Sequence, residues 1–456
     1  MPLFFQAKPM SQITHSARAV AARPSLRPFL LRLHFYIGLF VGPFIFAAAL
    51  TGLLYVLTPQ IESWLYRGAL YTDSTGPARS LTDQARAARD VLGTDLAVSA
   101  VRPAIAPGTT TRVMFADPSL GESENRTLFV DPVTLEVRGD LTTYGTTGIL
   151  PFRITLDYLH RNMLLGSFGR YYSELAASWL WVAVLGGVAL WATGPGPRRS
   201  LTRIPAPQRR RWLHSTIGLV LSLALLFVSL TGLTWSQQGG ARFEALQARL
   251  GWTTPSASAT LAGSQALASG HGDHAGHGPA VREDRLDQLD AVAAAARAGG
   301  LDSPLMEIRL PKPQQAWVVR EYDRRWPTQV DTVAIHPDTM QITSRADFAN
   351  FTLVPKLIRW GIDAHMGVLF GVANQILMAV LAAGLMVMIA YGYLMWWARR
   401  PGAGEPLWAS WRRLSPGQRA SWAGLAVGLG GALPVLGVSL VFFLAVDLLR
   451  MRRVAV

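Results

Sequence analysis

Long apolar segments without a charged residue constrain the fold of this chain more than any other feature. Crossing a bilayer takes about 20 apolar residues in a helix. Four segments meet this length without a charge: 35–58, 175–193, 215–235 and 366–398. A fifth, 422–446, is uncharged but is interrupted by GLGGALP around Pro434. It fits either one kinked span or a re-entrant pair of half-helices, and we expect a span.

The basic residues gather in three segments that flank these spans. Segments 1–33, 194–212 and 398–420 hold 16 Lys and Arg residues against one acid, and this excess is larger than the net charge of +14 for the whole chain. Because Lys and Arg accumulate on the cytoplasmic side of membranes, we expect these segments in the cytoplasm and no nucleic acid partner. Three arginines conflict with a fifth span, which would place them outside: Arg450, Arg452 and Arg453.

Two long loops, 59–174 and 236–365, are then expected on the opposite side of the membrane. Each is too long for a connector and predicts a small domain. Each has a helical stretch followed by β-branched segments that meet at a turn, in RTLFVDPVTLEVRG and QVDTVAIHPDTMQITS. Alternating strands around Asp131-Pro132 and His336-Pro337 are typical of β-hairpins. The fold class expected is an α-helical membrane protein with four to five spans and two small α+β domains outside the membrane.

The chain is a tandem repeat with two offsets. At 180 residues the matches include His34 with His214 and Thr51-Gly52 with Thr231-Gly232. At 205 residues they include His160 with His365 and Gly187 with Gly392. The difference indicates an insertion, for which the low-complexity segment 254–280 has about the right length. Since both repeats run in the same direction, an axis near the membrane normal should relate them, and equivalent residues should lie at equal depth.

Four of the nine histidines therefore form two matched pairs. The pairs are His34 with His214, at the cytoplasmic ends of two spans, and His160 with His365, just outside the other two. A b-type haem takes one axial imidazole from each side and packs among apolar helices. The absence of cysteine excludes covalent haem attachment and iron–sulfur clusters. We expect one or two haem b groups at these pairs, with three candidate propionate partners: Arg32, Arg211 and Arg161.

The histidines also have other interpretations. A single histidine at a helix start is more often a cap or an interfacial residue than a ligand, and duplication would repeat a structural histidine as well. His271, His274 and His277 form H-x-x-H-x-x-H in the insertion, which can bind a divalent metal loosely. In that Gly- and Ala-rich setting, incidental or accessory binding is the expected role. No Walker A motif and no G-x-G-x-x-G after a strand occurs, so no nucleotide site is expected.

Several segments, taken in order, resemble the PepSY-associated transmembrane helix family. They are LHFYIGLFVGPFIFAAALTGLLY, YLHRNMLLGSFGRYYSELAASWLW, RRWLHSTIGL with SLTGL, and AHMGVLFGVANQ ending in YLMWWARRP. The loops with VDPVTLEV and AIHPDTMQI look like its PepSY modules. The resemblance covers nearly the whole chain apart from the N-terminal tail and the His-rich insertion. It implies a multi-pass protein of the bacterial inner membrane with periplasmic PepSY domains.

The resemblance also implies a function. Some family members are haem-containing reductases that release Fe²⁺ from ferric siderophores, and the family's histidines correspond to the two pairs above. We expect a haem-b oxidoreductase that passes electrons from quinol or another membrane donor to a periplasmic ferric chelate in iron acquisition. One alternative is a non-catalytic membrane protein whose PepSY domains bind envelope peptides or proteins. Another is a periplasmic metal-handling accessory that uses the His-rich insertion.

The expected organisation consists of a cytoplasmic tail (1–33), spans at 34–58, 175–193, 214–235, 366–398 and 422–447, periplasmic domains at 59–174 and 236–365, cytoplasmic loops at 194–213 and 399–421, and a C-terminal tail at 448–456.

Overall fold

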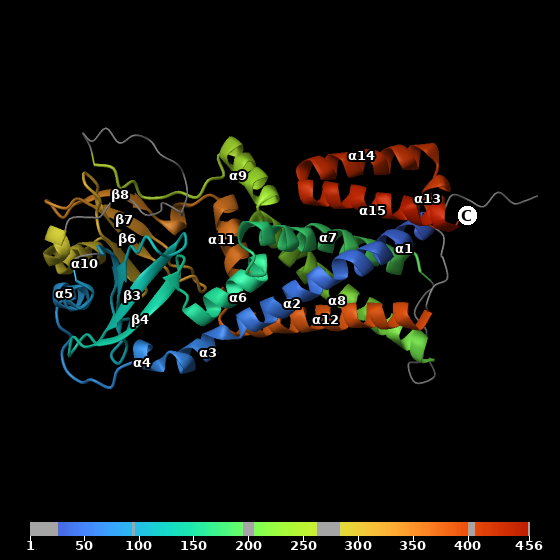
Figure 1. Ribbon diagram of the computed structural model, residues 1–456. Helices are drawn as coiled ribbons and strands as arrows, with labels where there is room; N and C mark the ends of the chain where they lie inside the picture. The colour runs from blue at the N-terminus through green and yellow to red at the C-terminus, as the bar shows by residue number, and fades with distance from the viewer. Residues whose placement is uncertain (1–25, 94–95, 195–204, 262–282, 400–405, 455–456) are drawn as a thin grey trace, which may run out of the picture.

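The molecule consists of a bundle of long helices with a β-sheet unit at one end (Figure 1). This architecture comes from a computed structural model, which describes residues 26–93, 96–194, 205–261, 283–399 and 406–454. We call the end of the bundle that carries the sheet the sheet end. The opposite end, where the first helix begins, we call the basic end.

Four helices in the described residues are long and apolar enough to cross a membrane, and they coincide with the four uninterrupted apolar segments. The first is made of α1 (Arg27–Tyr36), a π-helical turn (Ile37–Val41) and α2 (Gly42–Val56). The others are α7 (Gly166–Ala192), α8 (Ala206–Thr234) and α12 (Val372–Arg399). Helix α12 begins six residues after the uncharged segment does, because Gly367 and Gly371 adopt positive φ angles and form a turn there.

The four helices pack as the tandem repeat predicts. Helix α2 contacts α7 and α12, and α8 contacts the same two helices. The repeat equivalents α2 and α8 therefore occupy opposite corners of the bundle, as do α7 and α12. Val41 and Leu225, which belong to opposite corners, are both fully buried in the core of the bundle.

The two long loops meet in one antiparallel sheet of eight strands, ordered β4-β3-β2-β1-β5-β6-β7-β8. The first loop supplies β1 (Val98–Arg102), β2 (Thr111–Phe115), β3 (Glu124–Val130) and β4 (Val137–Tyr144). The second supplies β5 (Met306–Arg309), β6 (Trp317–Glu321), β7 (Thr332–Ile335) and β8 (Ile342–Ala346). The strands predicted around the two turns correspond to β3–β4 and β7–β8, and each loop contributes two further strands. Because β1 pairs with β5 at Val101 and Ile308, the two units share one sheet.

One face of this sheet is covered by two helices, α5 (Leu81–Leu92) and α10 (Leu289–Ala298), which share a single apolar core with the strands. Both predicted hairpin turns are present, between β3 and β4 and between β7 and β8. In the first, the Asp131 carboxylate accepts the N–H of Val133 at 2.8 Å. In the second, His336 Nδ1 accepts the N–H of Asp338 at 3.2 Å, so His336 is a turn residue as expected.

Short helices join the sheet to the bundle. They are α3 (Thr58–Leu65), α4 (Arg67–Leu70), α6 (Pro151–Asn162), α9 (Gln238–Leu250), the 3-10 turn Phe348–Asn350, and α11 (Leu353–His365). Another 3-10 turn, Glu283–Gln288, leads into α10 and packs on α5. Helices α6 and α11 lead into α7 and α12, and both lie between the sheet and the bundle (Figure 1).

The expectation that 422–447 forms one spanning helix is wrong. The segment contributes to two helices, α14 (Pro416–Ala432) and α15 (Pro434–Val454), which lie side by side and run antiparallel (Figure 1). Pro434 has no N–H to continue the first helix. A Cβ at Gly430 would lie 3.1 Å from the Cα of Gly437, so the two glycines allow this close approach. The hairpin returns the end of α15 to the basic end, where α1 begins (Figure 1).

Candidate functional site

The repeat brings the four matched histidines together as two pairs. His34 on α1 and His214 on α8 form the inner pair, with ring centres 6.2 Å apart and ring planes at 83°. His160 near the end of α6 and His365 at the end of α11 form the outer pair, at 6.5 Å and 65°. The inner pair is near the basic end and the outer pair is at the sheet end. In each pair the two rings come from equivalent helices of the two repeats.

Backbone carbonyls determine which nitrogen carries the proton in the inner pair. His34 Nδ1 lies 3.0 Å from the carbonyl oxygen of Ala183 on α7. His214 Nδ1 lies 2.9 Å from that of Met388 on α12. Because a carbonyl can only accept, Nδ1 must donate in both contacts. The proton is therefore on Nδ1, and Nε2 keeps the lone pair that a metal ligand needs.

In the outer pair, threonine hydroxyls determine which ring nitrogen carries the proton. His160 Nδ1 lies 3.1 Å from Thr51 Oγ1, and His365 Nδ1 lies 2.7 Å from Thr231 Oγ1. Each hydroxyl donates its own proton to a carbonyl one turn earlier in its helix, at 2.8 Å in both cases. The threonine oxygens therefore accept from the histidines. Within the described residues, Nε2 of none of the four histidines makes a hydrogen bond.

Four glycines leave room for the rings. A Cβ at Gly187 would lie 3.3 Å from His34 Cε1, and a Cβ at Gly52 would lie 3.3 Å from His160 Cε1. Their repeat equivalents, Gly392 and Gly232, lie in the same way against His214 and His365, at 3.8 Å. These glycines and the threonines recur in the sequence, but a Thr-Gly step in a membrane helix is also typical of close helix packing. Their repetition was the available signal: the Thr-Gly steps recur at 180 residues and Gly187 at 205, the two offsets at which the histidines recur.

The outer pair is neutral at ordinary pH. Burial lowers the pKa of His160, and burial together with the nearby His160 lowers the pKa of His365 to about 3. Two residues before His365, the fully buried Asp363 carboxylate lies 3.4 Å from Arg324 of the sheet unit. Burial raises the pKa of Asp363 to about 6, although the charge of Arg324 acts against it. The site thus combines neutral imidazoles with a charged contact to the sheet.

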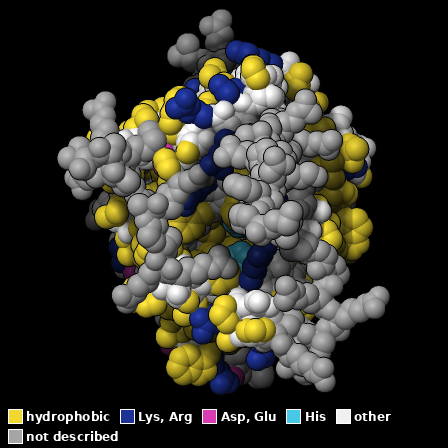
Figure 2. All heavy atoms as spheres, turned by 90° about the vertical axis from the view of Figure 1, so that its right-hand side faces the viewer, with side chains coloured by type: hydrophobic (Ala, Val, Ile, Leu, Met, Phe, Trp, Pro, Cys, Tyr) yellow, Lys and Arg dark blue, Asp and Glu magenta, His cyan; other side chains and the backbone are white. Residues whose placement is uncertain are grey.

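The three arginines expected near the pairs lie in different surroundings. Arg161, next to His160, donates to the hydroxyl of Tyr144 at 2.9 Å, while its buried Nε has no hydrogen-bond partner within the described residues. Arg32 is partly buried and Arg211 is exposed, on the helices of the inner pair. Figure 2 views the molecule from the basic end and shows a histidine side chain near the centre, with a Lys or Arg side chain beside it.

The pairs fit a haem iron. A metal–imidazole bond is about 2.0 Å long, and a ring nitrogen lies about 1.2 Å from its ring centre. Two imidazoles on opposite sides of one iron therefore have ring centres about 6.4 Å apart. The observed separations are 6.2 and 6.5 Å. Each pair also supplies two imidazoles with an available Nε2, packed against glycines. The donor set and its spacing therefore match two axial histidine ligands at each pair.

The other candidate metal site cannot be described. His271, His274 and His277 lie outside the described residues. Within the described residues, no group of three or more His, Asp or Glu side chains is arranged to hold a metal ion. The prediction of loose metal binding at the insertion therefore stays a prediction.

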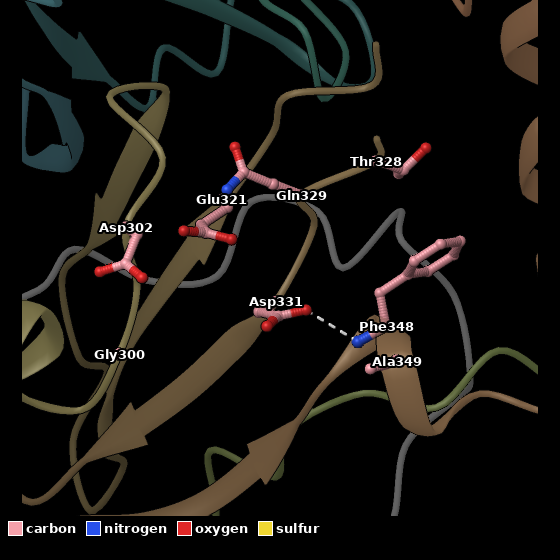
Figure 3. Close-up of a pocket in the computed structure, with 8 residues that line it drawn as sticks. All are labelled: Gly300, Asp302, Glu321, Thr328, Gln329, Asp331, Phe348 and Ala349. Atoms are coloured by element: carbon pink, nitrogen blue, oxygen red, sulfur yellow. Dashed lines mark hydrogen bonds between the residues drawn. The ribbon is translucent and has the colours of Figure 1, made fainter. Parts of the chain in front are cut away.

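A separate hollow of about 240 Å³ lies in the second half of the sheet unit (Figure 3). It is lined by Gly300, Asp302, Glu321, Thr328, Gln329, Asp331, Phe348 and Ala349. Trp360 of α11 donates to Thr328 Oγ1 at 3.2 Å, and its ring lies 5.8 Å from that of Phe348. The hollow is therefore packed against the helix that ends at His365.

The comparison with known families agrees with this architecture. None of the curated proteins matches the chain. The family described as the PepSY-associated TM region matches residues 31–399, a range that includes all four long helices but for the first turn of α1, all eight strands and both histidine pairs. The match ends before the C-terminal hairpin. The chain therefore belongs to the PepSY-associated TM region family.

Proposed function

We propose that this protein is a haem-b oxidoreductase of the bacterial inner membrane that reduces ferric chelates, such as ferric siderophores, in the periplasm. One observation carries the proposal. Two repeat-related histidine pairs, each with Nδ1 engaged and Nε2 available, have ring centres 6.2 and 6.5 Å apart. Two histidine ligands of one haem iron would need an available Nε2 on each ring and about this spacing, and both pairs provide them.

The two pairs have separate places in this proposal. His34 with His214 would hold one haem and His160 with His365 another, and each haem when bound supplies a one-electron carrier. His34 and Thr51, the partner of His160, are 17 residues apart, which is about 25 Å along a helix. The hydrocarbon core of a bilayer is about 30 Å thick. One pair would therefore lie near each face of the membrane, as electron transfer across it requires.

The surrounding residues would bind and orient the ligands. Ala183, Met388, Thr51 and Thr231 hold the Nδ1 protons, which would orient each ring and keep Nε2 available to a metal. Arg161 is available to a propionate through its unpartnered Nε. The basic end would face the cytoplasm and the sheet the periplasm, where the sheet unit would position the acceptor.

The electron balance follows from the reactants. A quinol is the proposed donor, and its oxidation to quinone releases two protons and two electrons. Each ferric ion takes one electron to become Fe²⁺, so one quinol reduces two ferric chelates. No nucleotide is needed in this scheme.

The test uses purified protein in vesicles that contain a reduced quinone, with a ferric chelate and an Fe²⁺-binding dye outside. The intact protein should produce Fe²⁺, and His214→Ala and His365→Ala should each abolish the reaction. His336→Ala is the matched control because His336 belongs to a surface turn, and its rate should equal that of the unchanged protein. If the haem-loaded protein gives no Fe²⁺ above empty vesicles, ferric reduction is wrong. If both pair variants keep the full rate, the assignment of the pairs is wrong.

A further inference from the structure

We propose that the C-terminal hairpin positions the inner histidine pair by holding α1 and α7 together from outside. This inference rests on the proposed function, since it treats the inner pair as a haem site. The hairpin consists of α13 (Leu407–Arg412), α14 and α15, and it lies beyond the part of the chain that matches the family.

The first contact is a buried carboxylate on α15. Asp447 is 3% exposed and accepts the hydroxyl proton of Tyr36 at 2.5 Å. It also accepts the backbone N–H groups of Leu407 and Trp408, at 3.1 and 3.2 Å, at the start of α13. Tyr36 lies two residues after His34 on α1. One side chain therefore connects α1, α13 and α15 close to a proposed ligand.

The second contact is aromatic. Phe443 of α15 is 7% exposed, and its ring centre lies 5.4 Å from that of Phe40 and 5.3 Å from that of Trp179 on α7. The indole N–H of Trp179 donates to Ser439 Oγ at 2.8 Å. Phe443 therefore bridges the helix that follows His34 and the helix whose Ala183 holds the His34 Nδ1 proton.

The support is one-sided at the inner pair. The hairpin packs on α1 and α7 of the first repeat and, at its turn, on α9, which follows α8. On α8, the equivalent of the first span, Val220 and Leu223 are 74% and 80% exposed. The π-helical turn at Ile37–Val41 occurs only in the supported span, whereas α8 is a regular α-helix throughout. The hairpin therefore supports the His34 side of the inner pair, whereas His214 is positioned by the four-helix bundle.

The test compares haem at one pair at a time. The His365→Ala background keeps only the inner pair, and the His214→Ala background keeps only the outer pair. Into each we introduce Tyr36→Phe or Phe443→Leu. The matched control is Phe442→Leu, because Phe442 is the neighbouring residue on α15 and is 61% exposed. The measurements are haem affinity by titration and the EPR spectrum of the oxidised protein, which reports the angle between the two imidazole planes.

We expect Tyr36→Phe and Phe443→Leu to weaken haem binding at the inner pair about tenfold, as loss of an outer-shell partner does, and to shift its EPR signal. The same changes should leave the outer pair unaltered, which also shows that the protein is folded. Phe442→Leu should change neither pair. Unchanged affinity and EPR signal at the inner pair would overturn the role of the hairpin. Absence of haem from both single-pair backgrounds would instead contradict the proposed function.

Discussion

Replacing Glu307 with glutamine should destabilise the sheet unit by about 3–5 kcal/mol, the usual cost of leaving one partner of a buried ion pair alone. Glu307 lies on β5, beside the strand pair that joins the two halves of the sheet. Its carboxylate accepts from Arg102 at 2.7 Å, from Arg309 at 2.8 Å and from Arg320 at 2.9 Å. The buried Arg102 sets the size of this loss of stability. Its side chain is only 1% exposed, so water cannot solvate its charge in place of the lost carboxylate.

The change should be visible in thermal unfolding followed by tryptophan fluorescence. Trp317 is fully buried in the sheet core and reports on this unit. A unit of this size loses about 2–4 °C in Tm for each kcal/mol, so we expect a fall of about 6–20 °C. Arg102→Met combined with Glu307→Gln should cost less than the sum of the two single changes, since it removes both buried charges. A fall of less than about 2 °C for Glu307→Gln would refute this reasoning, because that is below 1 kcal/mol.

Acid should lower the stability of the sheet unit by protonating the Glu307 carboxylate. Burial alone would raise the pKa of Glu307, but the charges of Arg102, Arg320 and Arg309 bring it far below its usual range. A depressed pKa gives a contribution to stability that is complete above the unfolded value of about 4.3 and is lost as the pH falls further. The unchanged protein should therefore lose more stability than Glu307→Gln on acidification below this pH. Equal acid dependence of the two would contradict the prediction.

Three further changes test the site and the hairpin. Gly187→Val should reduce the haem content of the inner pair, because a Cβ there already lies 3.3 Å from His34; full haem content would contradict the close packing. Thr231→Val keeps the side-chain shape but removes the acceptor of the His365 Nδ1 proton. Haem affinity at the outer pair, measured by titration, should therefore fall about tenfold. An unchanged affinity would show that the threonine is not needed. Gly437→Val should force α14 and α15 apart and make the hairpin sensitive to protease, and equal resistance would argue against their close approach.

The sequence predicted the features that repeat. The four long helices, the two hairpin turns and the pairing of His34 with His214 and of His160 with His365 all follow from apolar length and from matches at fixed offsets. The threonines that hold the outer pair were visible in the same matches. Their role was not, because a Thr-Gly step in a membrane helix is equally typical of close helix packing.

Two features depend on contacts that no local pattern specifies. The single sheet requires β1 to pair with β5, which lies about 200 residues away in the sequence, and each strand alone is compatible with the edge of a separate domain. The hairpin turns at Pro434, and a proline in an apolar segment fits a kink as well as a reversal. Packing of Phe443 against Phe40 and Trp179 favours the reversal, and that packing exists only in the folded chain.

The most direct test of the central claim is the haem content of the purified protein, measured by oxidised and dithionite-reduced absorption spectra with a pyridine haemochrome assay. Two repeat-related pairs predict two haem b groups per chain, with α and β bands that sharpen on reduction. His214→Ala and His365→Ala should each retain one. A protein that stays free of haem after expression with ample haem supply would contradict the claim, and the histidine pairs would then be structural.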